Sequence, residues 1–177
     1  MPAGTQAVHD PDVMGVIVVA TDGSETATAA LDAAIELARG GGHSLAVITV
    51  WRALQGDYGL AYPSTALLED LLDAERRHAE ETLADAVSRC HAAGVEVLTR
   101  LSTGDPAECI CAYARELDAR LVAMGTHGYG SVMTLFVGSV SGNVIRRAGR
   151  PVLVVPSAQE RDDAGRGRGR APLARAS

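Results

Sequence analysis

The feature that most constrains the fold of this chain is the alternation of short β-branched runs with longer segments of helical character. Residues 15–21, GVIVVAT, form a continuous apolar run of the kind found in strands that are buried on both faces. Four further strands are predicted, at residues 44–51, 95–101, 120–125 and 151–155.

The segments between these runs carry the start and stop signals of helices. Ser24 can cap a helix whose apolar stripe at residues 27, 30, 31, 34, 35 and 38 ends at three glycines. A long helix is predicted at about 66–92, before Gly94. Asp105 and Pro106 then form a strong helix start, with Glu108 placed as in a capping box, and a short helix is predicted at about 139–148.

Five strands with four intervening helices predict an α/β fold with a single doubly wound, five-stranded parallel sheet, Rossmann-like, with helices on both faces. Ligands of such sheets bind beyond the carboxyl ends of the strands, where the winding direction reverses. The unusual residues cluster after the first and fourth strands. We therefore expect these two strands to be neighbours.

Composition favours one soluble domain. The chain has 177 residues, of which 47% are hydrophobic and 21% charged, and no apolar run approaches the ~18 residues of a membrane span. The first residues lack the basic start and apolar stretch of a secretion signal, so a cytoplasmic location is expected. We expect a folded domain at 14–156, with a disordered tail at 1–13 and a disordered Arg/Gly-rich tail at 157–177.

The charged residues exclude several functions. A formal charge of −6 argues against a nucleic-acid partner. All 16 basic residues are arginine, which excludes a Walker-type phosphate lysine and Schiff-base chemistry. Cys90, Cys109 and Cys111 are expected to be free packing thiols. A bound nucleotide would therefore depend on backbone amides and hydroxyl groups for its phosphates.

A glycine-rich connection follows the fourth predicted strand. It reads GTHGYG from Gly125 and continues to Gly138 and Ser139 at the start of the last helix. Glycines let the backbone approach a ligand, and the first N–H groups of a helix bind anions. The alternative is that the glycines only form turns and that Ser139 is an ordinary N-cap. Spacing alone leaves both open.

Asp22 stands at the end of the first predicted strand, at the mouth of the same crevice. Its carboxylate can accept hydrogen bonds from ribose hydroxyls or adenine, or help to hold Mg²⁺. The alternative is an Asx-type turn leading into the helix, and the two are compatible.

Together these elements resemble the universal stress protein family, in particular its ATP-binding branch. The spacing Gly, two residues, Gly, nine residues, Gly, then Ser or Thr is met by Gly125, Gly128, Gly138 and Ser139. The opening VVATDGSETA, the segments GTHG and GSV, and the closing RPVLVVP also match. The resemblance covers about residues 15–156.

The resemblance implies a role for each matched position. Asp22 would contact the ribose or adenine, and Ala20 and Val50 would line the adenine slot. Met124 and Gly125 would border the nucleoside, whereas His127 and Gly128 would approach the phosphates. The phosphate cradle would be completed by Gly138, Ser139 and Val140. The chain departs from common members at Ala20, where proline is frequent, and at Tyr129, where a basic residue is frequent.

The resemblance also implies a function. We expect a nucleotide-dependent stress-response switch that binds ATP, with or without Mg²⁺, and forms a homodimer through its last strand at Val152–Val155. Alternatives are a slow ATPase or autokinase, and a protein that binds AMP or cyclic AMP. No catalytic residues and no protein metal site are predicted, and at most weak ATP hydrolysis is expected. The TDGSET segment lacks the loop of adenylating enzymes.

Overall fold

The computed structural model describes residues 15–51, 65–126 and 138–156, with only the backbone for 65–67. In chain order the elements are β1 (Val16–Ala20), α1 (Glu25–Gly41), β2 (Ser44–Trp51), α2 (Thr65–Ala92), β3 (Val97–Thr103), α3 (Pro106–Glu116), β4 (Leu121–Gly125), α4 (Ser139–Arg147) and β5 (Val152–Val155). The two predicted tails lie outside the described residues.

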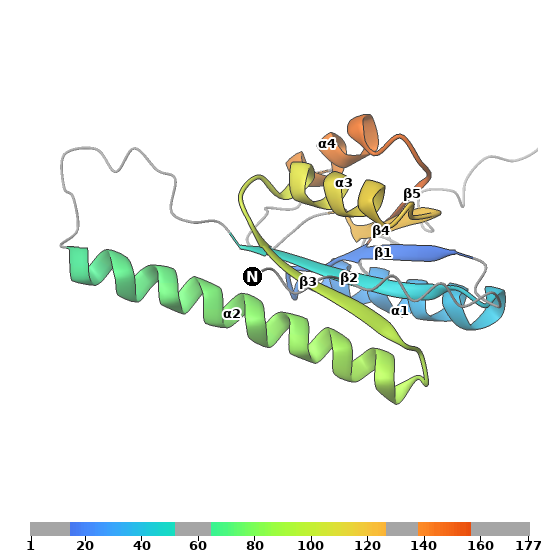
Figure 1. The fold of residues 1–177 in the computed structure, drawn as a ribbon, viewed down its shortest axis with the longest axis horizontal. Helices are drawn as coiled ribbons and strands as arrows, with labels where there is room; N and C mark the ends of the chain where they lie inside the picture. The colour runs from blue at the N-terminus through green and yellow to red at the C-terminus, as the bar shows by residue number, and fades with distance from the viewer. Residues whose placement is uncertain (1–14, 52–64, 127–137, 157–177) are drawn as a thin grey trace, which may run out of the picture.

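The five strands form one parallel sheet in the order β3-β2-β1-β4-β5 (Figure 1). The chain winds outward from β1 to β3, then crosses to β4 on the other side of β1. The winding direction therefore reverses between β1 and β4, where ligands of such sheets bind. The prediction that the first and fourth strands are neighbours is confirmed, as is the doubly wound fold class.

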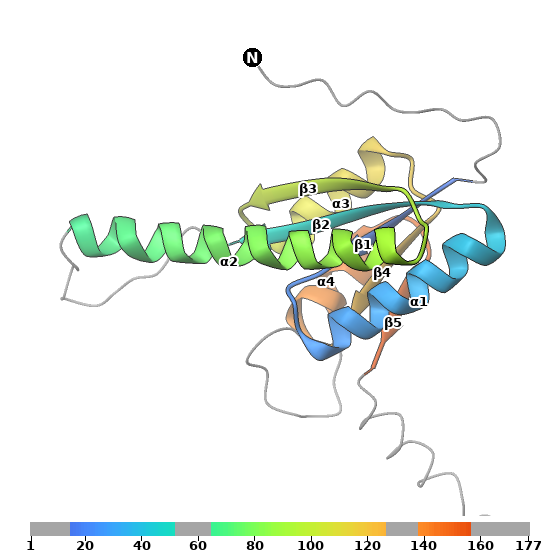
Figure 2. The ribbon, with the colours of Figure 1, turned by 90° about the horizontal axis from the view of Figure 1, so that it is seen from below.

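The helices cover the sheet in two layers. Helices α3 and α4 lie on one face and α1 and α2 on the other (Figures 1 and 2). Side chains alternate between the layers as the period of a strand requires. Val18 and Ile48 pack with Tyr113 of α3, whereas Val19 of β1 packs with Leu31 of α1 in the second core.

Local signals in the sequence determine where the helices begin and end. Ser24 caps α1, its hydroxyl accepting from the Ala27 N–H at 3.3 Å, and Asp105 caps α3, accepting from the Glu108 N–H at 2.8 Å. Gly42 ends α1 in the left-handed region, with φ of 62°. These caps are the predicted ones.

The third strand begins later than predicted, at residue 97 instead of 95. Val95 lies in the turn that follows α2, where its N–H donates to the Cys90 carbonyl at 3.0 Å. Gly94 has φ of 71°, which allows this reversal. Val95 is apolar because it packs into the core beneath α1 and α2, not because it pairs with β2.

The thiols belong to the core packing. Cys90 and Cys111 are buried, and Cys109 is half-buried. Burial raises the pKa of each thiol above its ordinary value. Within the described ranges, no three His, Cys, Asp or Glu side chains gather to hold a metal ion. The described helices include none that is both long and apolar enough to cross a membrane.

Candidate functional site

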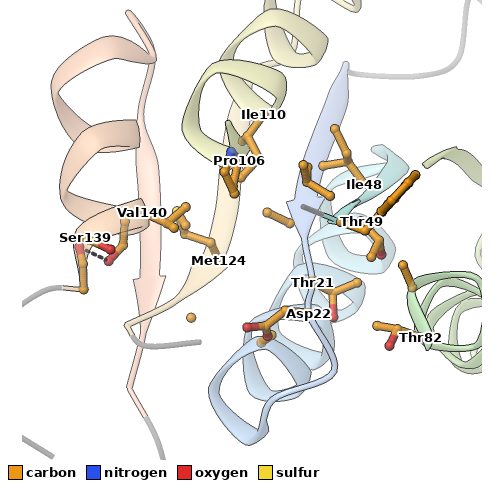
Figure 3. Close-up of a pocket in the computed structure, with 18 of the residues that line it drawn as sticks. Thr21, Asp22, Ile48, Thr49, Thr82, Pro106, Ile110, Met124, Ser139 and Val140 are labelled. Atoms are coloured by element: carbon orange, nitrogen blue, oxygen red, sulfur yellow. Dashed lines mark hydrogen bonds between the residues drawn. The ribbon is translucent and has the colours of Figure 1, made fainter. Parts of the chain in front are cut away.

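A cavity of about 520 Å³ opens at the carboxyl edge of the sheet, beside the point where the winding reverses (Figure 3). Its floor consists of the last residues of β1, β2 and β4. The first turn of α4 and one side of α2 form walls. Segments from the whole length of the described chain therefore meet at this one cavity.

Most of the predicted site residues line this cavity. They come from the ends of three strands and from the start of α4: Ala20, Asp22, Val50, Met124, Gly125, Gly138, Ser139 and Val140. His127 and Gly128 lie outside the described residues. The cavity is thus lined near β1, β2 and β4 by both apolar and polar side chains, and at α4 by a helix N-terminus.

Asp22 forms the turn that joins β1 to α1. Its Oδ1 accepts a hydrogen bond from the Ser24 N–H at 3.1 Å, the Asx-type turn considered in the sequence. The Thr21 hydroxyl accepts from the Gly23 N–H at 3.2 Å in the same turn. The carboxylate nevertheless lines the cavity, so the turn and a binding role are compatible.

The start of α4 has the features of an anion site. Its N-cap is Gly138, not Ser139, so the idea that Ser139 is an ordinary N-cap is wrong. No side chain makes a capping hydrogen bond there, and the first turn holds no acidic residue. The first N–H groups of a helix have no partner within the helix and carry a partial positive charge. Residues 138–141 line the cavity, so the N-terminus of α4 lies at the cavity wall.

The structure gives a further reason for a glycine at position 125, which the spacing of the glycine motif did not reveal. A Cβ at this position would lie 2.7 Å from the backbone carbonyl carbon of Thr26 and closer still to the Thr26 hydroxyl. The first turn of α1 packs directly on the end of β4. Glycine here therefore permits close contact between helix and strand as well as access to the cavity.

The contribution of α2 to the cavity was not predicted from the sequence. This helix crosses the carboxyl edge of the sheet and adds Glu75, His78 and Thr82 to the cavity wall. Thr49, a polar residue inside the apolar run SLAVITVW of β2, also lines the cavity and was not predicted as a site residue. A hydroxyl-bearing residue within such an apolar run was the sequence signal that could have identified Thr49 as a site residue. The charged side chains among the described lining residues are the carboxylates of Asp22 and Glu75, and no arginine lies among them.

Comparison with known proteins identifies the family. A family model described as the universal stress protein family matches residues 14–156. This chain belongs to the universal stress protein family. A universal stress protein of Thermus aquaticus is 35% identical over 139 residues, which are 78% of this chain and 96% of the relative.

Solved universal stress proteins have the same fold. UspA from Lactobacillus plantarum superposes with a TM-score of 0.68 at 27% identity, covering 81% of this chain and 98% of that one. A universal stress protein in complex with cAMP has a TM-score of 0.59 at 28% identity, covering 80% and 96%. The protein from Archaeoglobus fulgidus in complex with dAMP has a TM-score of 0.56 at 29% identity, covering 81% and 98%. Relatives thus bind adenine nucleotides.

Proposed function

We propose that this universal stress protein binds an adenine nucleotide, with ATP as the first candidate, and works as a nucleotide-dependent switch in the stress response. The observation that carries the proposal is the meeting of eight predicted binding residues at one cavity. They come from three strand ends and from the N-terminus of α4. Relatives in complex with cAMP and dAMP support adenine as the base.

The two ends of the cavity differ in chemistry, and this suggests an orientation for the nucleotide. The base would lie against Ala20, Val50 and Met124, and Asp22 would accept hydrogen bonds from the nucleoside. The phosphates would lie at Gly138, Ser139 and Val140, where backbone N–H groups replace the absent lysine. His127 and Gly128 are proposed to approach the phosphates as the glycine spacing suggests.

A binding role is preferred to an enzymatic one. Phosphoryl transfer requires cations that neutralise charge on the transferred group, together with a positioned water or hydroxyl. The described lining supplies Asp22 and Glu75 but no arginine. Any Mg²⁺ would arrive with the nucleotide. We propose that ATP turnover is slow and incidental to binding.

The relatives in complex with cAMP and dAMP favour a second candidate ligand class, the nucleoside monophosphates. A single phosphate needs fewer N–H donors than a triphosphate. We also propose a cytoplasmic homodimer that pairs through β5. This strand lies at the edge of the sheet, where its outer N–H and C=O groups are available to a second copy.

Calorimetric titration of nucleotide-free protein tests the proposal. ATP is titrated with and without Mg²⁺, followed by AMP and cyclic AMP. Saturable binding of ATP supports the nucleotide switch, and binding of cyclic AMP alone would replace ATP as the ligand. If no adenine nucleotide binds, the glycine spacing has only a structural role in this chain and the proposed function is wrong.

A further inference from the structure

The cavity extends beyond the residues that the nucleotide proposal uses. On the α2 side of β1 it is lined by three threonines: Thr21 at the end of β1, Thr49 on β2 and Thr82 on α2. Their exposed fractions are 8%, 3% and 8%. Figure 3 shows these side chains on one side of β1, with Met124 and Val140 on the other. The cavity therefore has two sides of different polarity.

The hydroxyl of Thr49 is buried without a hydrogen-bond partner. Among the described residues only one other buried side-chain N or O atom, Nδ1 of His43, shares this condition. His43 lines a separate pocket, with Gly41 and Pro151, near the amino ends of the strands. A buried hydroxyl without a partner is unfavourable, because it has lost its hydrogen bonds to water and forms none within the protein. A bound group in the cavity would satisfy it.

The other groups on this side limit what that group can be. Ala79 and Trp51 supply apolar surface, and the charged lining residues Glu75 and Asp22 are acidic. No arginine lies among the described lining residues, so a phosphate would meet repulsion here. A threonine hydroxyl both donates and accepts hydrogen bonds, which suits an uncharged polar group.

We propose that Thr21, Thr49 and Thr82 form a second subsite, the threonine subsite, which takes an uncharged hydrogen-bonding group of the bound nucleoside. Thr49 Oγ1 makes the contact that sets ligand preference. The inference rests on the proposed function, since it requires a nucleoside in the cavity. Two parts of a nucleoside carry this chemistry: the polar edge of the base and a hydroxyl of the sugar.

The test measures binding of AMP to the wild type and to Thr49→Val by calorimetry. Valine keeps the shape of threonine and removes the hydroxyl. We expect a loss of affinity of about tenfold, the value of one hydrogen bond. The melting temperature of the nucleotide-free variant should be unchanged or higher, because a hydroxyl without a partner has been removed. A purely structural role of the hydroxyl predicts an unchanged affinity for AMP and a lower melting temperature.

Three further variants complete the experiment. Thr49→Ser keeps a hydroxyl and should retain most of the affinity. Thr99→Val makes the same change on β3, outside the cavity, and should leave affinity unchanged. Thr82→Val tests the subsite from the side of α2 and does not depend on whether Thr49→Val folds. It should also lower the affinity for AMP.

Analogues identify the part of the nucleoside that is bound. If a sugar hydroxyl occupies the subsite, 2′-deoxy-AMP or 3′-deoxy-AMP binds the wild type more weakly, and Thr49→Val does not weaken that analogue further. If the base edge occupies it, both deoxy analogues stay sensitive to Thr49→Val, whereas purine riboside 5′-monophosphate, which lacks the amino group, does not. Either result supports the threonine subsite.

Two outcomes overturn the inference, and they are distinguishable. If the wild type binds AMP and both valine variants at 49 and 82 bind it equally well, the ligand does not contact these hydroxyls and the threonine subsite is wrong. The proposed function then stands. If the wild type binds no adenine nucleotide, the proposed function and the threonine subsite fail together.

Discussion

The hydroxyl of Ser141 donates a hydrogen bond to the carbonyl oxygen of Thr126 at 2.9 Å. The N–H of Gly138 donates to the same oxygen, also at 2.9 Å. These two bonds join the end of β4 directly to the first turn of α4. The floor of the cavity at β4 and its wall at α4 are therefore held together by one carbonyl group, and the geometry of the anion site depends on it.

Ser141→Ala is expected to lower the free energy of unfolding by about 1–2 kcal/mol, because Ser141 is only 2% exposed and its bond forms in the interior. The carbonyl of Thr126 keeps the Gly138 donor, which limits the loss. Urea unfolding of both proteins measures the difference. Ser139→Ala, on the same helix but exposed, should change stability by less than about 0.5 kcal/mol. Equal losses in the two variants would contradict this account.

Gly125→Ala should destabilise the fold by about 1–3 kcal/mol, since the new methyl group would lie 2.7 Å from the backbone of Thr26. Either β4 or the start of α1 must move. Gly40→Ala provides a control of opposite sign: Gly40 lies within α1, and a Cβ there meets nothing within 4 Å. Alanine at position 40 should stabilise the helix by up to about 1 kcal/mol. Thermal unfolding of both variants measures these shifts.

Features that depend on local sequence were predictable. The apolar runs identified β1, β2 and β4, since a strand buried on both faces needs continuous apolar residues. The strand β3 contains Thr99 and Arg100 and is only partly buried, and its start was predicted two residues too early. Ser24 and Asp105 identified two helix starts because an N-cap acts through N–H groups only three residues away. The clustering of unusual residues after the first and fourth strands also gave the correct neighbours in the sheet.

Two features that depend on contacts between distant segments were not predicted. The crossing of α2 over the carboxyl edge places Thr82 at the same cavity as Thr49 and Thr21, and no local pattern specifies that crossing. Gly125 illustrates the same limit. Its spacing suggested access for a ligand, whereas its contact with Thr26 comes from the packing of α1 on β4.

The ion pair between Arg100 of β3 and Glu116 of α3 predicts a pH dependence of stability. Arg100 Nη2 donates to Glu116 Oε1 at 2.6 Å, and the guanidinium lies 4.1 Å from the centre of the Tyr113 ring. The hydrogen bonds from Arg100 lower the pKa of Glu116 below its ordinary 4.5. The resulting stabilisation is present above that ordinary value and is lost as the pH falls through the lower pKa of the folded protein.

Glu116→Gln should therefore be less stable than the wild type at neutral pH, by less than about 1 kcal/mol because both side chains are partly exposed. The difference should shrink as the pH is lowered below 4.5, the ordinary pKa of this carboxyl group. Urea unfolding of the two proteins across this range measures it. A difference that stays constant down to the acid limit would show that the charge of Glu116 contributes nothing.

The anion site at α4 is tested most directly by placing a charge at its cap. Gly138 has φ of −58° and ψ of 164°, a conformation open to any residue, and aspartate is a favourable N-cap. Gly138→Asp should therefore fold normally, with unchanged thermal stability or a gain of up to about 1 kcal/mol. Its carboxylate would occupy the first N–H groups of the helix and repel phosphate. We expect calorimetry to find a loss of affinity for ATP of well over about tenfold.

Gly138→Asn separates the charge from the space that the new side chain occupies. Asparagine also caps helices and has nearly the same shape as aspartate, but it carries no charge. It should retain more ATP affinity than Gly138→Asp, and the gap between the two variants should narrow at high salt because screening weakens the repulsion. If Gly138→Asp folds and binds ATP as tightly as the wild type, the phosphates do not lie at the N-terminus of α4. The orientation proposed for the nucleotide would then have to be abandoned, even if the cavity still binds the nucleoside.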